Sequence, residues 1–312
     1  VIASIPFIIA GFKWLFPIRR ALTYKEIVNY RILNYLEQLI QTMKEPPSLA
    51  IKHDFWQRLS RNRVLLLLVS LILFLLVWQV LVLVLDLPGF ILPSPAEVGG
   101  KFLDVLASGL LWRHFSATLV EILLGLVFGI SAATLLGYAL AKSPLAERLL
   151  SPFLVGSQSI PMAAIAPLLV IWFGPGLISK VLICSLTVFF PVLVNTLVGL
   201  RDVSPELREV MRSLRATPAQ TLRYLEVPAA LPVFLGGLRV GASLSVIGAI
   251  VGELVASDRG LGFLINVGRG QYDTALVFVA VICLVALAAS LYGLVLLLEN
   301  KALSWQTWRK EA

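Results

Sequence analysis

The sequence predicts an all-α membrane protein in which six helices cross the bilayer. Of its 312 residues, 58% are hydrophobic and 14% are charged, whereas about a quarter of the residues in a soluble domain are charged. The apolar residues also gather in runs of roughly 20, the length that a helix needs to cross the hydrocarbon core. Both observations indicate an integral membrane protein.

Six apolar runs define the predicted spans. They cover residues 64–85, 116–141, 152–173, 177–200, 233–256 and 275–298. These runs lie within a predicted membrane domain of residues 61–300, which a cytoplasmic tail of residues 301–312 follows. An even number of spans places both flanks of this domain on the same side of the membrane.

Residues 1–60 are expected to form an extension on the cytoplasmic surface. Residues 1–16 are apolar but short, and three interpretations stay open: a marginal extra span, a membrane-surface segment, or the remnant of a longer chain. We favour an interpretation other than a full span, and no small-residue cleavage site follows that would indicate a cleaved signal peptide. Residues 22–44 place apolar side chains near one helical face, which predicts an amphipathic helix on the membrane surface.

Basic residues predict the orientation, because Lys and Arg are enriched in cytoplasmic loops. The richer set of flanks contains Lys52, Arg58, Arg61, Arg63, Lys142, Arg148, Arg201, Arg208, Arg212, Arg215, Arg223, Lys301, Arg309 and Lys310. The opposite set contains Lys101, Arg113, Lys180, Arg259 and Arg269. The polar segment 201–232 is therefore expected in the cytoplasm, and the net charge of +8 is attributed to such loops and not to nucleic-acid binding.

Two helix-start signals occur in the segment 201–232. Ser204 precedes Pro205 and Thr217 precedes Pro218, which places a hydroxyl at each N-cap and a proline at the first helical position, where its missing N–H costs nothing. A glutamine three residues after Thr217 has the spacing of a capping box. Two short cytoplasmic helices are therefore predicted.

Small residues recur at every fourth position in two of the predicted spans. They are Gly125, Gly129, Ala133 and Gly137 in the second span, and Gly237, Gly241, Ser245 and Ala249 in the fifth. Such stripes let helix backbones approach closely in lipid. Packing within the chain is the favoured explanation, and a subunit interface or a moving gate are the alternatives.

Two prolines, Pro161 and Pro167, interrupt the third predicted span. Interrupted helices at membrane depth are tolerated where the freed backbone groups face protein or a water-filled cavity. A transport path and a simple kink in the bundle explain the prolines equally well. The candidates to line a path are Gln158, Ser159, Pro161, Met162, Ser245 and Glu253.

Three charged residues, Glu121, Arg239 and Glu253, lie well inside the predicted spans. Ionisable groups at membrane depth are expensive and often functional, but each of these lies close enough to a span end that we expect it to reach water. A proton-driven carrier would show more buried carboxylates or histidines. The sequence also lacks the paired carboxylates or Ser/His sets that a membrane enzyme would need.

The sequence predicts no cofactor, metal or disulfide on this chain. Cys184 and Cys283 lie inside apolar runs, where a small buried residue is the ordinary interpretation. His53 and His114 lie far apart, and no His, Cys and carboxylate cluster has the spacing of a metal site. The phosphate-binding pattern GxxxxGK[ST] is absent, so another subunit would have to supply any nucleotide energy.

Four stretches carry a resemblance to a known family. They are ILPSPAEV (91–98), IPMAAIAPLLVIWFGPG (160–176), the segment 204–232, and RGLGFLI (259–265) with Tyr272 and Asp273. They resemble the six-span, type I-like inner-membrane permeases of binding-protein-dependent ABC importers. The branch is the one that handles nitrate, sulfonates, taurine and vitamin-type heterocycles such as pyrimidine precursors and riboflavin.

The resemblance implies that residues 201–232 form a cytoplasmic coupling loop, whose two helices dock into a cleft of an ATP-binding subunit. The family pattern is Glu-Ala-Ala, three residues, then Gly. Glu209 matches the Glu, and Arg215 stands where Gly is expected. We expect the chain to turn through Ala216 and Thr217 instead; the alternative is that Arg215 accepts strain because it pairs with a carboxylate of the ATPase. The implied docking residues are Glu209, Val210, Met211, Leu214, Arg215, Ala216, Thr217 and Pro218.

The resemblance further implies a permease subunit of the bacterial inner membrane that is not itself an enzyme. Its partners would be a cytoplasmic ATP-binding subunit that uses ATP, an extracytoplasmic substrate-binding protein, a second permease copy and membrane lipids. The cargo would be a vitamin-type heterocycle (riboflavin or a pyrimidine precursor) or a sulfonate- or nitrate-type anion, and the few basic residues in the spans favour the neutral heterocycle. A self-contained secondary carrier or channel is the alternative, and a membrane-embedded enzyme is a third possibility.

Overall fold

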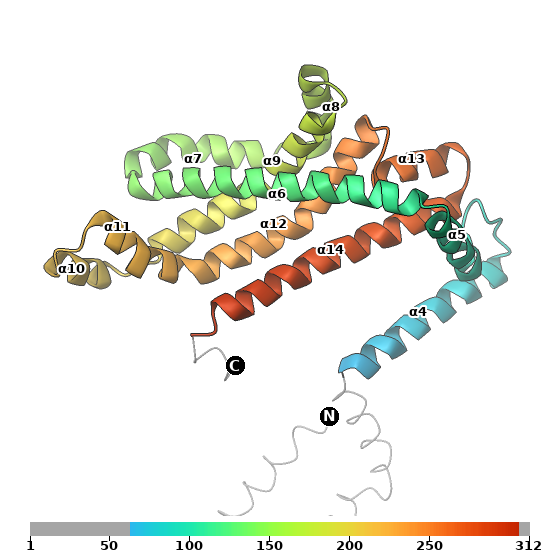
Figure 1. Cartoon of the computed structure of the whole chain (residues 1–312), viewed down its shortest axis with the longest axis horizontal. Coiled ribbons are helices and arrows are strands. Elements are labelled where there is room, and N and C mark those ends of the chain that lie inside the picture. The colour runs from blue at the N-terminus through green and yellow to red at the C-terminus, as the bar shows by residue number, and fades with distance from the viewer. Residues whose placement is uncertain (1–62, 306–312) are drawn as a thin grey trace, which may run out of the picture. The chain divides into compact units, whose positions relative to one another are not determined.

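The computed structural model describes residues 63–305 of the chain, and all regular elements in this range are helices (Figure 1). The expectations for residues 1–60 and for the end of the tail lie outside the described residues. The chain divides into two units, residues 1–74 and 75–312. Each unit is described by itself.

Within the described residues, the first unit consists of the N-terminal part of helix α4 (Arg63–Leu85). Every residue from Leu65 to Phe74 is exposed, although almost all of them are apolar. A helix that is apolar on all sides is suited to lipid. Helix α4 coincides with the first predicted span at 64–85.

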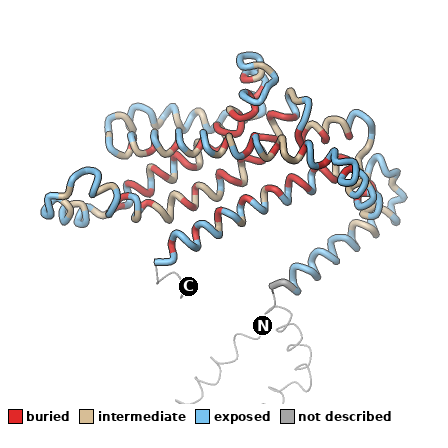
Figure 2. Tube along the Cα trace, viewed as in Figure 1, coloured by how far each residue is buried: buried red, intermediate tan, exposed pale blue. Residues whose placement is uncertain are grey.

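The second unit contains the remaining helices. Their bounds are α5 (Pro95–Ala107), α6 (Leu110–Lys142), α7 (Pro144–Gln158), α8 (Met162–Phe173), α9 (Leu177–Arg201), α10 (Pro205–Ser213), α11 (Pro218–Thr221), the π-helix η2 (Leu222–Glu226), α12 (Val227–Val255), α13 (Leu261–Gly270) and α14 (Thr274–Ala302). Helices α6, α9, α12 and α14 run alongside one another, with α10 and α11 at one end and α5 and α13 at the other (Figure 1). Buried residues concentrate on the facing sides of the four long helices (Figure 2).

Five helical stretches of the described chain are long and apolar enough to cross a membrane. They are Leu65–Leu85, Leu110–Lys142, Leu177–Arg201, Pro218–Val255 and Thr274–Ala302. Helices α7 and α8 would make a sixth span if they are counted together, but they are bent by 97° at their junction. The predicted interruption of the third span is therefore confirmed, and it is sharper than a kink.

The bend between α7 and α8 occurs at Pro161, not at Pro167. Pro161 is the N-cap of α8 and has extended backbone angles (φ −65°, ψ 130°). Proline has no N–H to continue the hydrogen bonding of α7, so the helix stops before it. Pro167 is accommodated inside α8.

The small residues of α6 let α9 approach closely. A Cβ atom added to Gly129 would lie 2.7 Å from the carbonyl oxygen of Ser185 in α9, and one added to Gly125 would overlap Cys184. In the predicted stripe of α12, a Cβ atom added to Gly237 would lie 2.5 Å from the Cβ atom of Asn195 in α9. The glycine stripes therefore serve packing within the chain, as the favoured interpretation predicted.

The two predicted helix starts in the segment 201–232 are confirmed. The Ser204 hydroxyl accepts a hydrogen bond from the Leu207 N–H, and Thr217 and Gln220 form a complete capping box. The second short helix does not stand alone, because α11 continues through η2 into α12.

The turn between α10 and α11 passes through Arg215, whose φ is +53°. The expectation that the chain turns through Ala216 and Thr217 was therefore wrong. The Ala216 N–H donates to the carbonyl oxygen of Met211 at 3.0 Å, which is the bond that ends a helix when the preceding residue is left-handed. Thr217 is held extended as the N-cap of α11, so the reversal falls on Arg215.

Candidate functional site

A buried ion pair joins α6 to α9 near the end of the bundle that carries α13. The Lys180 Nζ lies 2.5 Å from the Glu121 Oε1, and the two side chains are only 4% and 2% exposed. Lys180 also donates to the Ser257 hydroxyl at 3.0 Å. Removing either partner would leave an uncompensated charge in a low-dielectric interior, so the pair fixes the two helices together.

A second buried carboxylate, Glu253 of α12, lies beside this pair and is fully buried. Its two oxygens accept hydrogen bonds from the Thr118 hydroxyl at 2.6 Å and from the Gly262 N–H at 2.5 Å. Gly262 lies in the first turn of α13, where N–H groups have no partner within the helix. Glu253 therefore supplies from a distance the acceptor that a local cap would otherwise provide.

Helix α6 supplies the other acceptors at the start of α13. The Thr118 hydroxyl accepts from the Leu261 N–H at 2.8 Å, and the His114 Nδ1 accepts from the Gly260 N–H at 3.0 Å. Gly260 has φ +119° and a Cβ there would overlap the Glu253 carboxylate, so only glycine fits this position. The chain around α13 is thus fastened to α6 and α12 by buried hydrogen bonds.

The expectation that Glu121 and Glu253 reach water at their span ends was wrong, because both are buried in the helix packing. Arg239, the third charged residue of the predicted spans, pairs with Glu299 of α14. Lys180 was counted among the basic residues of the span flanks, although it lies in the first turn of α9 and is buried. The spacing of His114, Thr118 and Glu121 on one helical face was the sequence signal that could have revealed the cluster.

A polar cavity of 770 Å³ opens beside the ion pair. It lies between α6, the start of α9, and the loop after α12. Its lining residues with polar side chains are Arg113, Ser116, Glu121, Lys180, Ser257, Asp258 and Arg259. Such a volume is typical of ligand pockets, which span about 300–1,000 Å³.

A second cavity, of 640 Å³, contains three of the residues expected to line a path: Gln158, Pro161 and Met162. Thr187 and Asn195 of α9 line its opposite side. Ser159 is exposed. Ser245 is fully buried and donates to the Ala242 carbonyl oxygen, and Glu253 belongs to the cluster described above. Four of the six candidates therefore lie at the break between α7 and α8, and the other two are buried in α12.

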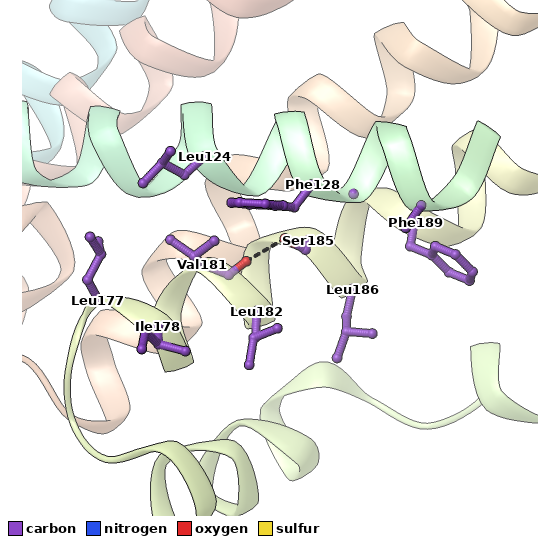
Figure 3. Close-up of a pocket in the computed structure, with 11 residues that line it drawn as sticks. Leu124, Phe128, Leu177, Ile178, Val181, Leu182, Ser185, Leu186 and Phe189 are labelled. Carbon is purple, nitrogen blue, oxygen red and sulfur yellow. Dashed lines mark hydrogen bonds between the residues drawn. The ribbon is translucent and has the colours of Figure 1, made fainter. Parts of the chain in front are cut away.

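A third hollow, of 610 Å³, lies between α6 and α9 (Figure 3). Its side chains are almost all apolar, with Leu124 and Phe128 on α6 and Leu177, Val181 and others on α9. The Ser185 hydroxyl, which lines it, donates back to the Val181 carbonyl oxygen at 2.7 Å. The groove therefore offers little to a polar solute and suits hydrocarbon.

The predicted docking residues lie at the opposite end of the bundle. Leu214 is 72% exposed and Val210 is 52% exposed. Glu209, Arg215, Thr217 and Pro218 are exposed as well, while Met211 and Ala216 are half-buried. Large apolar side chains that face outward beyond the span ends are typical of a contact surface for another protein.

Two contacts attach the segment from α10 to η2, which carries the predicted docking residues, to the long helices. The Arg208 Nη2 donates to the Leu200 carbonyl oxygen of α9 at 2.8 Å. The Lys142 Nζ of α6 contacts both carboxylate oxygens of Glu226 in η2, at 2.6 and 2.8 Å, and Glu226 is buried. A displacement of the segment would therefore be passed to α6 and α9.

The profile of one protein family, described as "Binding-protein-dependent transport system inner membrane component", matches residues 125–304. The chain is 48% identical over 238 residues to the riboflavin transport system permease protein RibX of Chloroflexus aurantiacus, a match that covers 76% of this chain and 89% of RibX. It is 35% identical over 235 residues to the formylaminopyrimidine transport permease protein ThiX of Halalkalibacterium halodurans, covering 75% of this chain and 93% of ThiX.

A solved structure supports the fold. A chain of the MetNI methionine ABC transporter in an inward-facing conformation superposes with a TM-score of 0.50 at 21% identity. The superposition covers 65% of this chain and 98% of that chain. At this identity the likeness concerns the fold alone.

Thr118 is predicted to be a stabilising residue of the α13 attachment. Thr118→Val keeps the shape but leaves Glu253 and the Leu261 N–H each without one buried partner, so we expect a loss of about 1–3 kcal/mol in the free energy of unfolding. Thr134→Val is the matched control on the same helix, because the Thr134 hydroxyl is buried without a hydrogen-bond partner among the described residues. The melting temperature of the purified protein measures both changes; equal melting temperatures would contradict the prediction.

Proposed function

The chain belongs to the family of binding-protein-dependent transport system inner membrane components, and we propose that it forms the import path for a small vitamin-type heterocycle such as riboflavin. It is a permease of an ATP-binding-cassette importer and a multi-pass protein of the inner membrane. The observation that carries the cargo assignment is the 48% identity to RibX over most of both chains. A sulfonate- or nitrate-type anion is the second candidate cargo.

The proposed complex contains two copies of this chain and two cytoplasmic ATP-binding subunits, which use ATP; this chain binds no cofactor. A binding protein on the other side of the membrane delivers the solute. The six membrane spans of the proposal are the five long helices and the bent pair α7–α8. In this arrangement the cavities of 770 and 640 Å³ face the solute and the apolar groove between α6 and α9 faces hydrocarbon.

We propose that α10 and α11 are the coupling helices and dock into the ATP-binding subunit. The exposed apolar side chains of Val210 and Leu214 support this, because they lie on a polar segment outside the apolar part of the bundle. Basic residues support the orientation. Those at this end are Lys142, Arg148, Arg201, Arg208, Arg212, Arg215, Arg223 and Lys301, and those at the other are Lys101, Arg113, Arg259 and Arg269. The positive-inside rule places the richer end in the cytoplasm.

We propose that Gln158, Pro161 and Met162 line part of the path, together with Ser159 at the same break. The break at Pro161 frees backbone groups next to a cavity, which is the arrangement that membrane transporters use for solute contacts. Ser245 and Glu253 would act on the path through helix packing, since both are buried.

Uptake of riboflavin tests the proposed function. Liposomes that contain the permease and its ATP-binding subunit, supplied with the binding protein outside, should accumulate riboflavin when ATP is enclosed, and an aliphatic sulfonate should not accumulate. Uptake that persists without the ATP-binding subunit would identify a self-contained carrier. Uptake of the sulfonate in place of riboflavin would support the second cargo.

Glu209 is predicted to contact the ATP-binding subunit. Glu209→Lys reverses a charge on the exposed face of α10 and should lower the amount of ATP-binding subunit that co-purifies by about tenfold, which corresponds to about 1.4 kcal/mol. Asp104→Lys makes the same charge reversal on an exposed residue of α5 at the opposite end and should leave co-purification unchanged. Equal co-purification of the two variants would show that α10 is not the docking element.

Arg215 is predicted to exchange backbone strain for an ion pair with the ATP-binding subunit. Its left-handed conformation costs about 1 kcal/mol more than it would for glycine. Arg215→Gly should therefore raise the melting temperature of the isolated permease by a few degrees and weaken binding of the ATP-binding subunit. Arg215→Lys, which keeps both the strain and the charge, should change neither greatly. Full binding by Arg215→Gly would rule out the ion pair.

A further inference from the structure

We propose that the 640 Å³ cavity at the break between α7 and α8 binds an uncharged solute, and that Thr187 and Asn195 of α9 accept hydrogen bonds from it. The inference rests on the importer function proposed above and deepens it by naming residues that recognise the solute. The solute class is an uncharged ring compound that carries N–H or O–H donors along one edge.

The absence of charge in this cavity gives the first reason. None of the residues that line it within the described part of the chain is charged. The cations Arg113, Lys180 and Arg259 line the 770 Å³ cavity and not this one. The break also brings the C-terminal end of α7 next to the N-terminal end of α8, and the partial charges of two such helix ends have opposite signs. A charged solute would therefore lose its hydration here without meeting a counter-ion, whereas an uncharged solute avoids that cost.

The polar groups that α9 adds to the cavity are left with acceptor oxygens. The Thr187 hydroxyl donates its proton to the Ile183 carbonyl oxygen at 2.7 Å. The Asn195 amide group donates to the Pro191 carbonyl oxygen at 2.8 Å, so its Oδ1 is the atom left for another partner. No described residue donates to either side-chain oxygen. The Thr187 oxygen, whose one proton is used, and the Asn195 Oδ1 are therefore free to accept hydrogen bonds from a solute.

Two glycines of α12 make room for these side chains. A Cβ atom added to Gly237 would lie 2.8 Å from the Asn195 Nδ2. One added to Gly248 would lie 2.9 Å from the Thr187 hydroxyl oxygen. Both distances are shorter than ordinary contacts of a Cβ atom, so a larger residue would force the polar group to shift. The packing of α12 on α9 thus fixes where the two acceptors lie in the wall of the cavity.

The rest of the lining suits a ring compound with a polar edge. Phe190, Leu186 and Ile165 offer apolar surface to the body of a ring. The Gln158 amide also lines the cavity and makes no hydrogen bond with any described residue. An unpaired amide is costly at membrane depth, and an amide can donate and accept at once. A solute with a carbonyl group beside an N–H group would satisfy it.

Thr187→Val tests the first acceptor. Valine keeps the shape of threonine, so the variant should assemble fully and melt close to the wild type, but a donor of the solute would lose its partner. We expect ATP-dependent riboflavin uptake to fall about tenfold. Thr196→Val is the matched control on α9, because the Thr196 hydroxyl also donates to a carbonyl oxygen of its own helix at 2.7 Å but is buried away from the cavity. It should retain uptake, and equal uptake by the two variants would overturn the proposal.

Asn195→Leu tests the second acceptor. Leucine has the branched shape of asparagine without its polar atoms, and the variant should lower riboflavin uptake by about tenfold as well. An Asn195→Leu complex that assembles fully and takes up riboflavin at the wild-type rate would contradict the proposed recognition.

Thiol labelling of the detergent-solubilised complex tests the cavity independently of uptake. The native Cys184 and Cys283 are buried, so Val194→Cys, at a half-open position of the cavity wall, provides the reactive thiol. Riboflavin should slow its labelling. The rate with an uncharged methanethiosulfonate reagent, divided by the rate with a charged one, should be about tenfold higher there than for Asp104→Cys on the exposed face of α5, because the cavity offers no counter-ion. The intrinsic reactivity of each thiol cancels in this ratio.

The two experiments separate the proposals. If the wild-type complex takes up no riboflavin but the cavity thiol prefers the uncharged reagent as expected, the cargo assignment fails and the uncharged site stands. If riboflavin is taken up but does not slow labelling of the Val194→Cys thiol, the importer function stands and the site is overturned. Equal reagent ratios at the Val194→Cys and Asp104→Cys thiols also overturn the site.

Discussion

Charged side chains inside this bundle must find partners on other helices, because the hydrocarbon around a membrane protein solvates neither positive nor negative groups. The Glu121–Lys180 pair joins α6 to α9, and the Arg239–Glu299 pair joins α12 to α14. Thr118 joins α6 to Glu253 of α12. Each contact satisfies a group that would otherwise be costly, and in doing so it fixes which helices are neighbours.

Local rules accounted for the features that depend on neighbouring residues. Ser204 and Thr217 begin helices because hydroxyl acceptors and following prolines act within a single turn. The glycine stripe of α6 indicated close packing, since a missing side chain has the same consequence wherever the partner lies. The interruption at Pro161 followed from the missing N–H alone, although the size of the bend depends on the packing of α8.

Features that depend on distant residues could not be predicted from the sequence. The contacts of Thr118 with Leu261 and of His114 with Gly260 join residues 143 and 146 positions apart. Lys180 begins an apolar run, where a lysine ordinarily reaches water, and only the position of α6 shows that it is buried. The left-handed Arg215 is a different case, because the length of α10 and the cap at Thr217 together decide which residue must turn.

The continuity of α11, η2 and α12 has a mechanical consequence. Residues Pro218–Val255 form one helical stretch of 38 residues, about 57 Å long at 1.5 Å per residue, which exceeds the hydrocarbon thickness of about 30 Å. The stretch acts as a rigid lever with two arms. One arm begins at Pro218, next to α10, on the side that faces the cytoplasm in the proposed orientation, and the other ends beside Glu253 and the first turn of α13. A tilt of a few degrees imposed at one arm would displace the far arm by roughly an ångström or two, enough to lengthen the hydrogen bonds there without any bend in the helix.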